Sequence, residues 1–186
     1  VRIGAEVAND TESPLSITLL QGVARGDKMD TILQKATELG VSRIVPLLLA
    51  RSTVKLGADG IARRHEHWLG VIASACEQCG RSRLPRLEPA AQLEAALETG
   101  DDGLKLLLSP DASAASLPAL LSAYPQAAQH GVCLLAGPEG GFDANEIAQA
   151  MASGYKPARL GPRVLRTETA GIAAITAVQV TAGDWR

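Results

Sequence analysis

Charged side chains gather near the C-terminus, between a buried strand and an apolar helix. Arg163, Arg166 and Glu168 lie close together there, and an alanine-rich stretch follows to about Val180. Arg166 is expected near the core, and a guanidinium kept charged there needs a carboxylate or phosphate partner. Glu168 could be that partner in a structural ion pair, or both side chains could face a substrate. We favour the substrate.

A glycine-rich turn follows the apolar run 132–136. Gly137, Gly140 and Gly141 surround Glu139 in this turn. Glycines allow a ligand to approach the backbone closely, with one carboxylate in reach. Their spacing matches neither a P-loop nor a dinucleotide-binding turn. Alone, the turn is explained equally well as a tight lead into a helix.

A second turn, Leu160 to Arg166, contains Gly161 and follows another strand candidate. Two small-residue turns at adjacent strand ends indicate a ligand pocket, because ligands of α/β sheets bind beyond the carboxyl ends of the strands. Asp143 and Glu146, after the first turn, are instead typical of a helix N-cap and its capping-box partner.

The elements that position these turns alternate between strand and helix, which predicts an α/β fold with a parallel sheet flanked by helices. Asp27 is the expected N-cap of the first helix and Gly40 its stop. Strands are expected at 1–7, 15–20, 43–50, 104–108, 132–136 and about 159–160, and helices from 27 to 39 and at 62–78, 91–97, 117–124, 144–153 and 168–180.

Composition limits the possible function classes. The 186 residues suffice for one α/β domain, and a hydrophobic content of 46% excludes a disordered chain. A formal charge of −2 excludes a protein that is basic overall, so any RNA contact must come from local clusters such as Arg81, Arg83 and Arg86. No apolar run approaches the roughly 18–20 residues of a membrane span.

Cysteine usage predicts a reduced, cytoplasmic protein. Cys76 and Cys79 form a C-x-x-C motif, which could be a redox site or half of a zinc site. No second such motif follows and the pair ends a helical pattern, so we favour packing thiols. We expect no metal, because the three histidines lack a ligand constellation.

The two turns together resemble the signature segments of the RsmE family, which are 16S ribosomal RNA uridine N3-methyltransferases of the SPOUT superfamily. The segments that carry the resemblance are 137–142 and 160–170. Two upstream segments, 28–41 and 77–85, agree with the family in the right order. Several ordered motifs make the resemblance specific.

The resemblance implies a deep C-terminal trefoil knot whose turns hold S-adenosylmethionine. It implies methyl transfer to uracil N3 of a uridine in 16S rRNA of the small ribosomal subunit, by a homodimer that needs neither a metal nor a membrane. The residues it assigns are Arg166 and Glu168 for catalysis; Gly137, Glu139, Gly141, Leu160, Gly161 and Leu165 for the cofactor; and Arg81, Arg83 and Arg163 for RNA.

The resemblance also predicts a domain boundary. Family members carry an N-terminal PUA-like β-domain that helps to bind RNA. We therefore interpret residues 1–20 as the remnant of that domain with a linker, and residues 21–186 as the SPOUT methyltransferase domain.

Two other functions fit the same turns. The first is a related SPOUT enzyme that methylates a tRNA base or a ribose 2′-hydroxyl, which analysis of modified nucleosides would distinguish. The second is a non-catalytic module that binds nucleotides or RNA, which failure to bind S-adenosylmethionine would favour.

Overall fold

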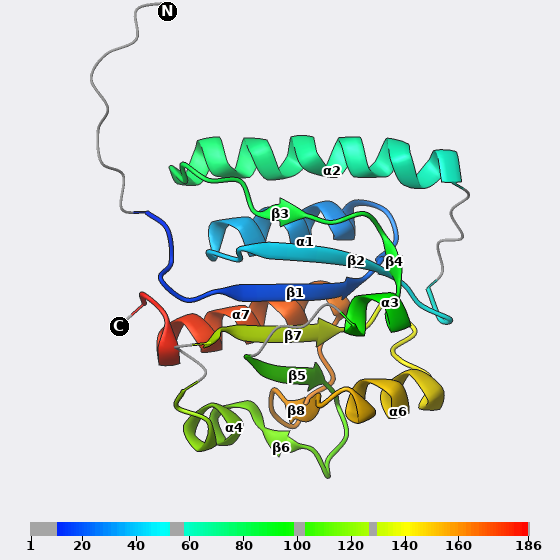
Figure 1. Cartoon of the computed structure of the whole chain (residues 1–186), viewed down its shortest axis with the longest axis vertical. Helices are drawn as coiled ribbons and strands as arrows, with labels where there is room; N and C mark the ends of the chain where they lie inside the picture. Colours follow the sequence, from blue (N-terminus) through cyan, green and yellow to red (C-terminus); the bar gives the residue numbers. More distant parts are fainter. Residues whose placement is uncertain (1–10, 53–57, 99–102, 127–129, 186) are drawn as a thin grey trace, which may run out of the picture.

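A parallel sheet lies between two layers of helices in the computed structural model, which describes residues 11–52, 58–98, 103–126 and 130–185 (Figure 1). The predicted α/β class is confirmed; the strand expected at 1–7 lies outside the described residues. Among the described helices, none combines the length and apolar character needed to cross a membrane. The elements are β1 (Ile17–Gly22), α1 (Asp27–Glu38), β2 (Arg43–Leu48), α2 (Ala58–Cys79), β3 (Arg86–Leu87), β4 (Ala91–Gln92), α3 (Leu93–Leu97), β5 (Leu104–Leu108), β6 (Ala115–Ser116), α4 (Leu117–Ala123), β7 (Val132–Ala136), α6 (Ala144–Ala152), β8 (Lys156–Arg159) and α7 (Thr167–Ala182).

The strands follow the order β3-β2-β1-β7-β5-β8-β6, with β4 also paired to β2. Each of these pairings is parallel. The arrowheads of β1, β2, β5 and β7 accordingly point the same way in Figure 1. The carboxyl ends of the strands therefore share one edge of the sheet, where an open α/β fold binds its ligands.

The central strands are buried on both faces, which explains their continuous apolar sequences. Successive side chains of a strand point to opposite faces. Leu19 and Leu134 thus join a cluster with α1, α2, α4 and α7, whereas Leu20 and Leu135 join a second cluster with α3 and α6. The sheet separates two cores, and β1 and β7 contribute to both.

Local details differ from the sequence-based expectations where an element is short or a cap is ambiguous. Strands β3, β4 and β6 have two residues each, too few to show a period, and were not expected. The helix expected at 91–97 begins only at Leu93. The N-cap of α1 is Gly26 with no side-chain capping bond, so the expectation for Asp27 was wrong. Gly40 does follow the helix, with a φ of +81°.

The two turns do not follow adjacent strands, contrary to expectation, because β5 lies between β7 and β8. The turn after β7 instead lies beside the end of β1. A Cβ on Gly22 would come within 2.6 Å of the ring of Pro138, so a side chain there would displace the turn. A ligand site at this edge would therefore be built from the ends of β1 and β7, together with the second turn.

Candidate functional site

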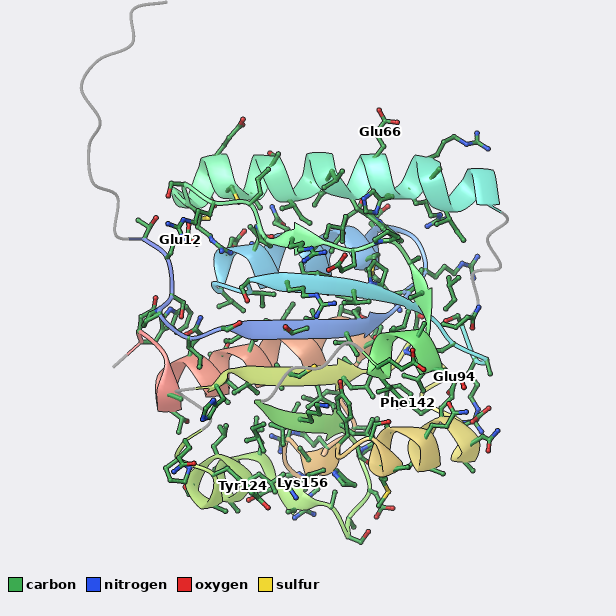
Figure 2. All side chains as sticks on the ribbon, viewed as in Figure 1. Glu12, Glu66, Glu94, Tyr124, Phe142 and Lys156 are labelled. Atoms are coloured by element: carbon green, nitrogen blue, oxygen red, sulfur yellow. The ribbon has the colours of Figure 1, made fainter. Side chains whose placement is uncertain are left out.

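The turn after β7 is packed so tightly that its glycines are required. A Cβ on Gly140 would lie 2.8 Å from backbone and Cβ atoms of Arg51, and one on Gly137 would lie 3.1 Å from the ring of Phe142. Gly141 has a φ of +67°, and its N–H donates to the carbonyl of Pro138 at 2.9 Å. Phe142 packs against the apolar cluster that includes α3 (Figure 2). The turn therefore exposes backbone from a fixed position.

The carbonyl of Gly137 joins three elements. The Thr167 hydroxyl at the start of α7 donates to it at 2.5 Å, and Gln21 Nε2 at the end of β1 lies 3.4 Å away. Gln21 Nε2 also donates to Thr167 Oγ1 at 3.2 Å, and the Gln21 side chain is fully buried. These bonds hold the start of α7, and with it the end of the second turn, beside the first turn.

Sequence reasoning did not single out Gln21 or Thr167. A signal was present for Gln21, because an amide in an otherwise apolar strand must find a partner when buried. Thr167 carried no such signal, since a threonine at a helix start is ordinary. Its role depends on which strand ends lie beside it.

Three charged side chains meet beside the turn. Lys28 Nζ, from the first turn of α1, lies 3.1 Å from Glu139 Oε1 and 3.8 Å from Glu168 Oε2. Burial opposes ionisation of Glu139, but N–H donors of its own backbone and of Arg25, together with Lys28, outweigh burial and lower its pKa. The predicted site residues Glu139 and Glu168 are thus brought together through Lys28, which lies in the upstream segment 28–41 and was not predicted as a site residue.

The second turn combines a packed end with an exposed middle. Leu160 packs against the larger core, Leu165 is half-buried, and Gly161 has a φ of +117°. Arg163, Val164 and Arg166 are exposed. The expectation that Arg166 lies near the core is wrong: it is the exposed N-cap of α7 and forms no ion pair with another described residue. Arg166 and Glu168 therefore do not form the structural ion pair that was considered.

Of the arginines predicted to contact RNA, Arg81 has a different environment from Arg83 and Arg163. Its guanidinium donates to Glu12 Oε2 at 2.8 and 3.1 Å and to the carbonyls of Thr37 and Val41 at 2.8 and 2.9 Å. The side chain is only 6% exposed. Arg81 therefore fastens the segment before β1 to the ends of α1 and α2, whereas Arg83 and Arg163 are exposed.

The described cysteines are free thiols, with Cys76 and Cys133 buried. Burial raises the pKa of the Cys76 thiol. Across the described ranges, no group of His, Cys, Asp and Glu side chains has the arrangement of a metal site.

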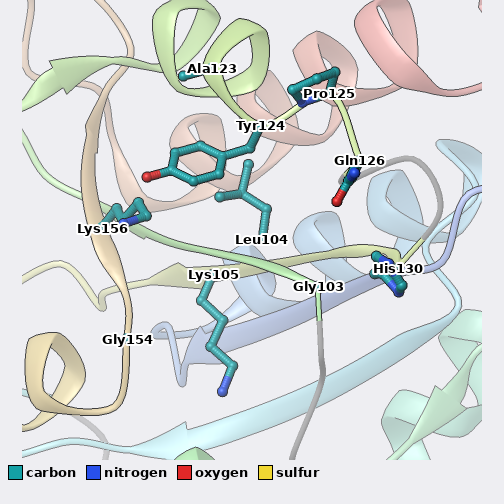
Figure 3. A pocket seen from close by; sticks show the side chains of 10 residues that line it. All are labelled: Gly103, Leu104, Lys105, Ala123, Tyr124, Pro125, Gln126, His130, Gly154 and Lys156. Carbon is teal, nitrogen blue, oxygen red and sulfur yellow. The ribbon is translucent and has the colours of Figure 1, made fainter.

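An open cavity of about 420 Å³ lies at the opposite edge of the sheet, beside the first residues of β5 and β8 (Figure 3). Lys156 Nζ lies 4.9 Å from the centre of the Tyr124 ring. Lys105 points away from Lys156 and from Tyr124, and its Nζ lies over the ring of Tyr155. The two lysines do not converge, so this cavity lacks the arrangement of a site for an anionic ligand.

The known proteins that this chain resembles in sequence are RNA methyltransferases. Residues 11–179 match the family model described as an RNA methyltransferase domain. The ribosomal RNA small subunit methyltransferase E of Buchnera aphidicola subsp. Schizaphis graminum is 38% identical over 93% of this chain and 68% of its own length.

Two solved structures resemble this one, each with a TM-score of 0.86. One is a methyltransferase from Legionella pneumophila in complex with the bound cofactor SAM, 41% identical, with 94% of this chain and 69% of that chain covered. The other is a ribosomal RNA small subunit methyltransferase E from Neisseria gonorrhoeae bound to S-adenosyl methionine, 38% identical, with 97% and 72% covered.

Replacing Thr167 by valine is expected to loosen the join between the first turn and α7. The change leaves the Gly137 carbonyl without its closest donor, so we expect the free energy of unfolding to fall by about 1–3 kcal/mol in urea titrations. Thr167→Ser keeps the hydroxyl and is the matched control. Equal stability of the valine and serine variants would contradict this role.

Arg81→Ala is expected to lower the free energy of unfolding by roughly 2–4 kcal/mol, because Glu12 and two carbonyls lose a buried donor. Arg83→Ala, an exposed neighbour, should stay within about 0.5 kcal/mol of the parent chain. A smaller loss for Arg81 than for Arg83 in thermal or urea unfolding would refute the assignment.

The Arg81–Glu12 pair also predicts a pH dependence. Burial alone would raise the pKa of Glu12, but hydrogen bonds from Arg81 and from backbone N–H groups of Ser82 and Arg83 lower it. The pair therefore contributes fully above about pH 5 and loses its contribution as the pH falls toward the lowered pKa. Stability of the parent chain should consequently fall more steeply in acid than that of Arg81→Ala.

Proposed function

The chain belongs to the RsmE family of RNA methyltransferases, and on this premise we propose that it methylates uracil N3 of a uridine in 16S rRNA of the small ribosomal subunit with S-adenosylmethionine. The observation that supports the proposal is the site at the strand ends: a rigid glycine turn that exposes backbone, with a cation and two carboxylates beside it.

The residues of the two turns fit the cofactor. Arg159 Nε and Glu168 Oε2, on either side of the second turn, are buried polar atoms without a hydrogen-bond partner among the described residues. A ligand with both donors and acceptors would satisfy them. We assign the cradle to the residues that the resemblance indicates: Gly137, Glu139, Gly141, Leu160, Gly161 and Leu165. When bound, S-adenosylmethionine supplies a methyl group on a sulfonium, which makes it open to attack by a nitrogen.

The chain's own task in this reaction concerns the base. Uracil N3 carries a proton and becomes a nucleophile only when that proton leaves. The protein must therefore orient the imide edge, accept the proton and stabilise the charge that develops on the flanking carbonyl oxygens. The site offers carboxylate acceptors and an ammonium donor within a few ångströms of each other.

RNA contacts are assigned to exposed arginines. Arg163 and Arg166 flank Val164 on the open side of the second turn, and Arg83 is exposed beyond α2. An exposed guanidinium suits a phosphate contact, which positions RNA without reading its sequence. We do not assign Arg81 to RNA, because its donors are occupied.

The C-terminal segment is proposed to form a trefoil knot. Strand β7 lies between β1 and β5, and the chain then passes through α6 on one face and β8 beyond β5. It returns as α7 on the other face, against α1, α4 and β7. Such a return is compatible with passage of α7 inside the connection from β5 to β7. The test is an experimental structure of the chain. The knot would be refuted if the path of its backbone contained no segment that passes through a loop formed by another.

We propose that the chain has the domain organisation and the dimeric assembly that the family resemblance implies. The boundary expected after residue 20 would divide β1, which runs from Ile17 to Gly22. We therefore propose a boundary before Ile17, with the preceding residues assigned to the end of a PUA-like β-domain and its linker. The chain is proposed to act as a homodimer in the cytoplasm. A monomer mass by sedimentation at micromolar concentration would contradict the dimer.

The proposed function predicts both binding and a specific product. Calorimetry should show saturable binding of S-adenosylmethionine, and small subunits that lack the modification should gain N3-methyluridine, detected by mass spectrometry of the rRNA nucleosides. No binding would refute a methyltransferase. A methylated ribose or a methylated tRNA in place of N3-methyluridine would indicate another SPOUT activity.

Arg166→Ala is expected to reduce methyl transfer to RNA by about tenfold or more, because a phosphate contact beside the site is lost, while the affinity for S-adenosylmethionine stays within about threefold. Arg63→Ala, an exposed arginine on α2, is the matched control. Activity of Arg166→Ala equal to that of Arg63→Ala would refute the role of Arg166.

A further inference from the structure

The cluster of Lys28, Glu139 and Glu168 contains one acceptor that the fold leaves unused. Glu168 Oε2 is buried and has no hydrogen-bond partner within the described part of the chain. A buried carboxylate oxygen without a hydrogen bond is costly, and native structures rarely retain one without a function. Its nearest cation, Lys28 Nζ, lies 3.8 Å away, which is beyond hydrogen-bond length.

Lys28 is held by the other carboxylate. Its ammonium donates to Glu139 Oε1 at 3.1 Å, and the Arg25 N–H donates to the same oxygen. An ammonium has three donors, so two of them remain for other acceptors. Glu139 therefore fixes Lys28 at a position where it can donate to a ligand beside Glu168.

Arg166 does not compete for Glu168. It precedes α7 on the exposed side and forms no ion pair with another residue that the structure describes. Among the described ion pairs, Glu168 is joined to Lys28, from α1, and Lys28 in turn is joined to Glu139, from the turn after β7. Glu168 and Lys28 thus present an acceptor and a donor side by side.

This arrangement complements the imide edge of uracil, where the N3–H donor lies next to a carbonyl acceptor. We propose, on the basis of the proposed function, that the Glu168 carboxylate, on a side chain that is 21% exposed, accepts the N3 proton while Lys28 donates to the adjacent carbonyl oxygen. The N3–H bond breaks, the proton bonds to Glu168, and the electron pair stays on N3 and spreads to the carbonyl oxygens. The Lys28 ammonium stabilises the charge there.

The same pair selects against cytosine. Cytosine has an unprotonated N3, so its edge would place an acceptor against the Glu168 carboxylate. That mismatched polar contact in a partly buried site favours uracil.

The test is single-turnover methylation of small subunits by the full chain with Glu168→Gln or Lys28→Met. We expect the first change to lower the rate by about 10²–10⁴-fold and the second by about 10²-fold. Lys28→Arg keeps the charge and should lose less. Lys35→Met, which removes an ion pair with Glu38 on the same helix, is the matched control and should keep the parent rate.

Two further measurements separate this role from a structural one. Calorimetry should give an affinity for S-adenosylmethionine within about threefold of the parent for both variants, which also shows that they fold. Substrate with 5-fluorouridine at the target position, whose N3–H is more acidic, should restore Glu168→Gln by about tenfold or more and change the parent little.

The outcomes distinguish the two proposals. If the parent chain makes no N3-methyluridine, the proposed function fails and this inference with it. If the parent is active and Glu168→Gln keeps a rate within about threefold, or if 5-fluorouridine does not restore its lost rate, only this inference is overturned. A Lys28→Met rate equal to that of Lys35→Met would also overturn it.

Discussion

The Gly137 carbonyl is the constraint on which the site depends. One hydroxyl and one buried amide converge on it, from α7 and β1, so that three segments far apart in sequence share a few hydrogen bonds. A turn of glycines has no side chains to hold it in place, and its stiffness must come from neighbours. Fixing the backbone through its carbonyl leaves the rest of the turn free to contact a ligand.

Charge at the site is arranged by the same convergence. Lys28 belongs to the first turn of α1, Glu139 to the turn after β7 and Glu168 to the first turn of α7. Two carboxylates beside one ammonium leave the cluster negative, which suits a cationic sulfonium, while the ammonium is the group that suits negative charge on the base. The exposed arginines at the rim carry the opposite sign, which suits RNA.

Much of the fold was predictable, because its long elements have clear periods. The strands at 104–108 and 132–136 and the capping box of Asp143 and Glu146 appear in the structure as expected. The neighbour of β7 was not predictable, since strand order is not encoded in periodicity. The same limit explains why the exposure of Arg166 and the burial of Arg81 were not predicted. The burial of an arginine depends on which carbonyls and carboxylates the fold brings to it. The role of Lys28 was not predictable either, because Glu139 and Glu168 lie more than a hundred residues away in the sequence.

The position of β7 has a consequence for how the chain acquires its structure. Strand β1 can pair with β2 early, but its other neighbour is β7, with Ile17 opposite Val132. During synthesis β1 must therefore keep an apolar edge unpaired until much of the chain has emerged, which slows folding and exposes the edge to aggregation. Because β7 leads directly into the glycine turn, the strand that covers this edge of β1 also brings the first turn of the site into place. The site is complete only when the later segments β8 and α7 have also joined the sheet and its helices, so ligand binding depends on nearly the whole chain.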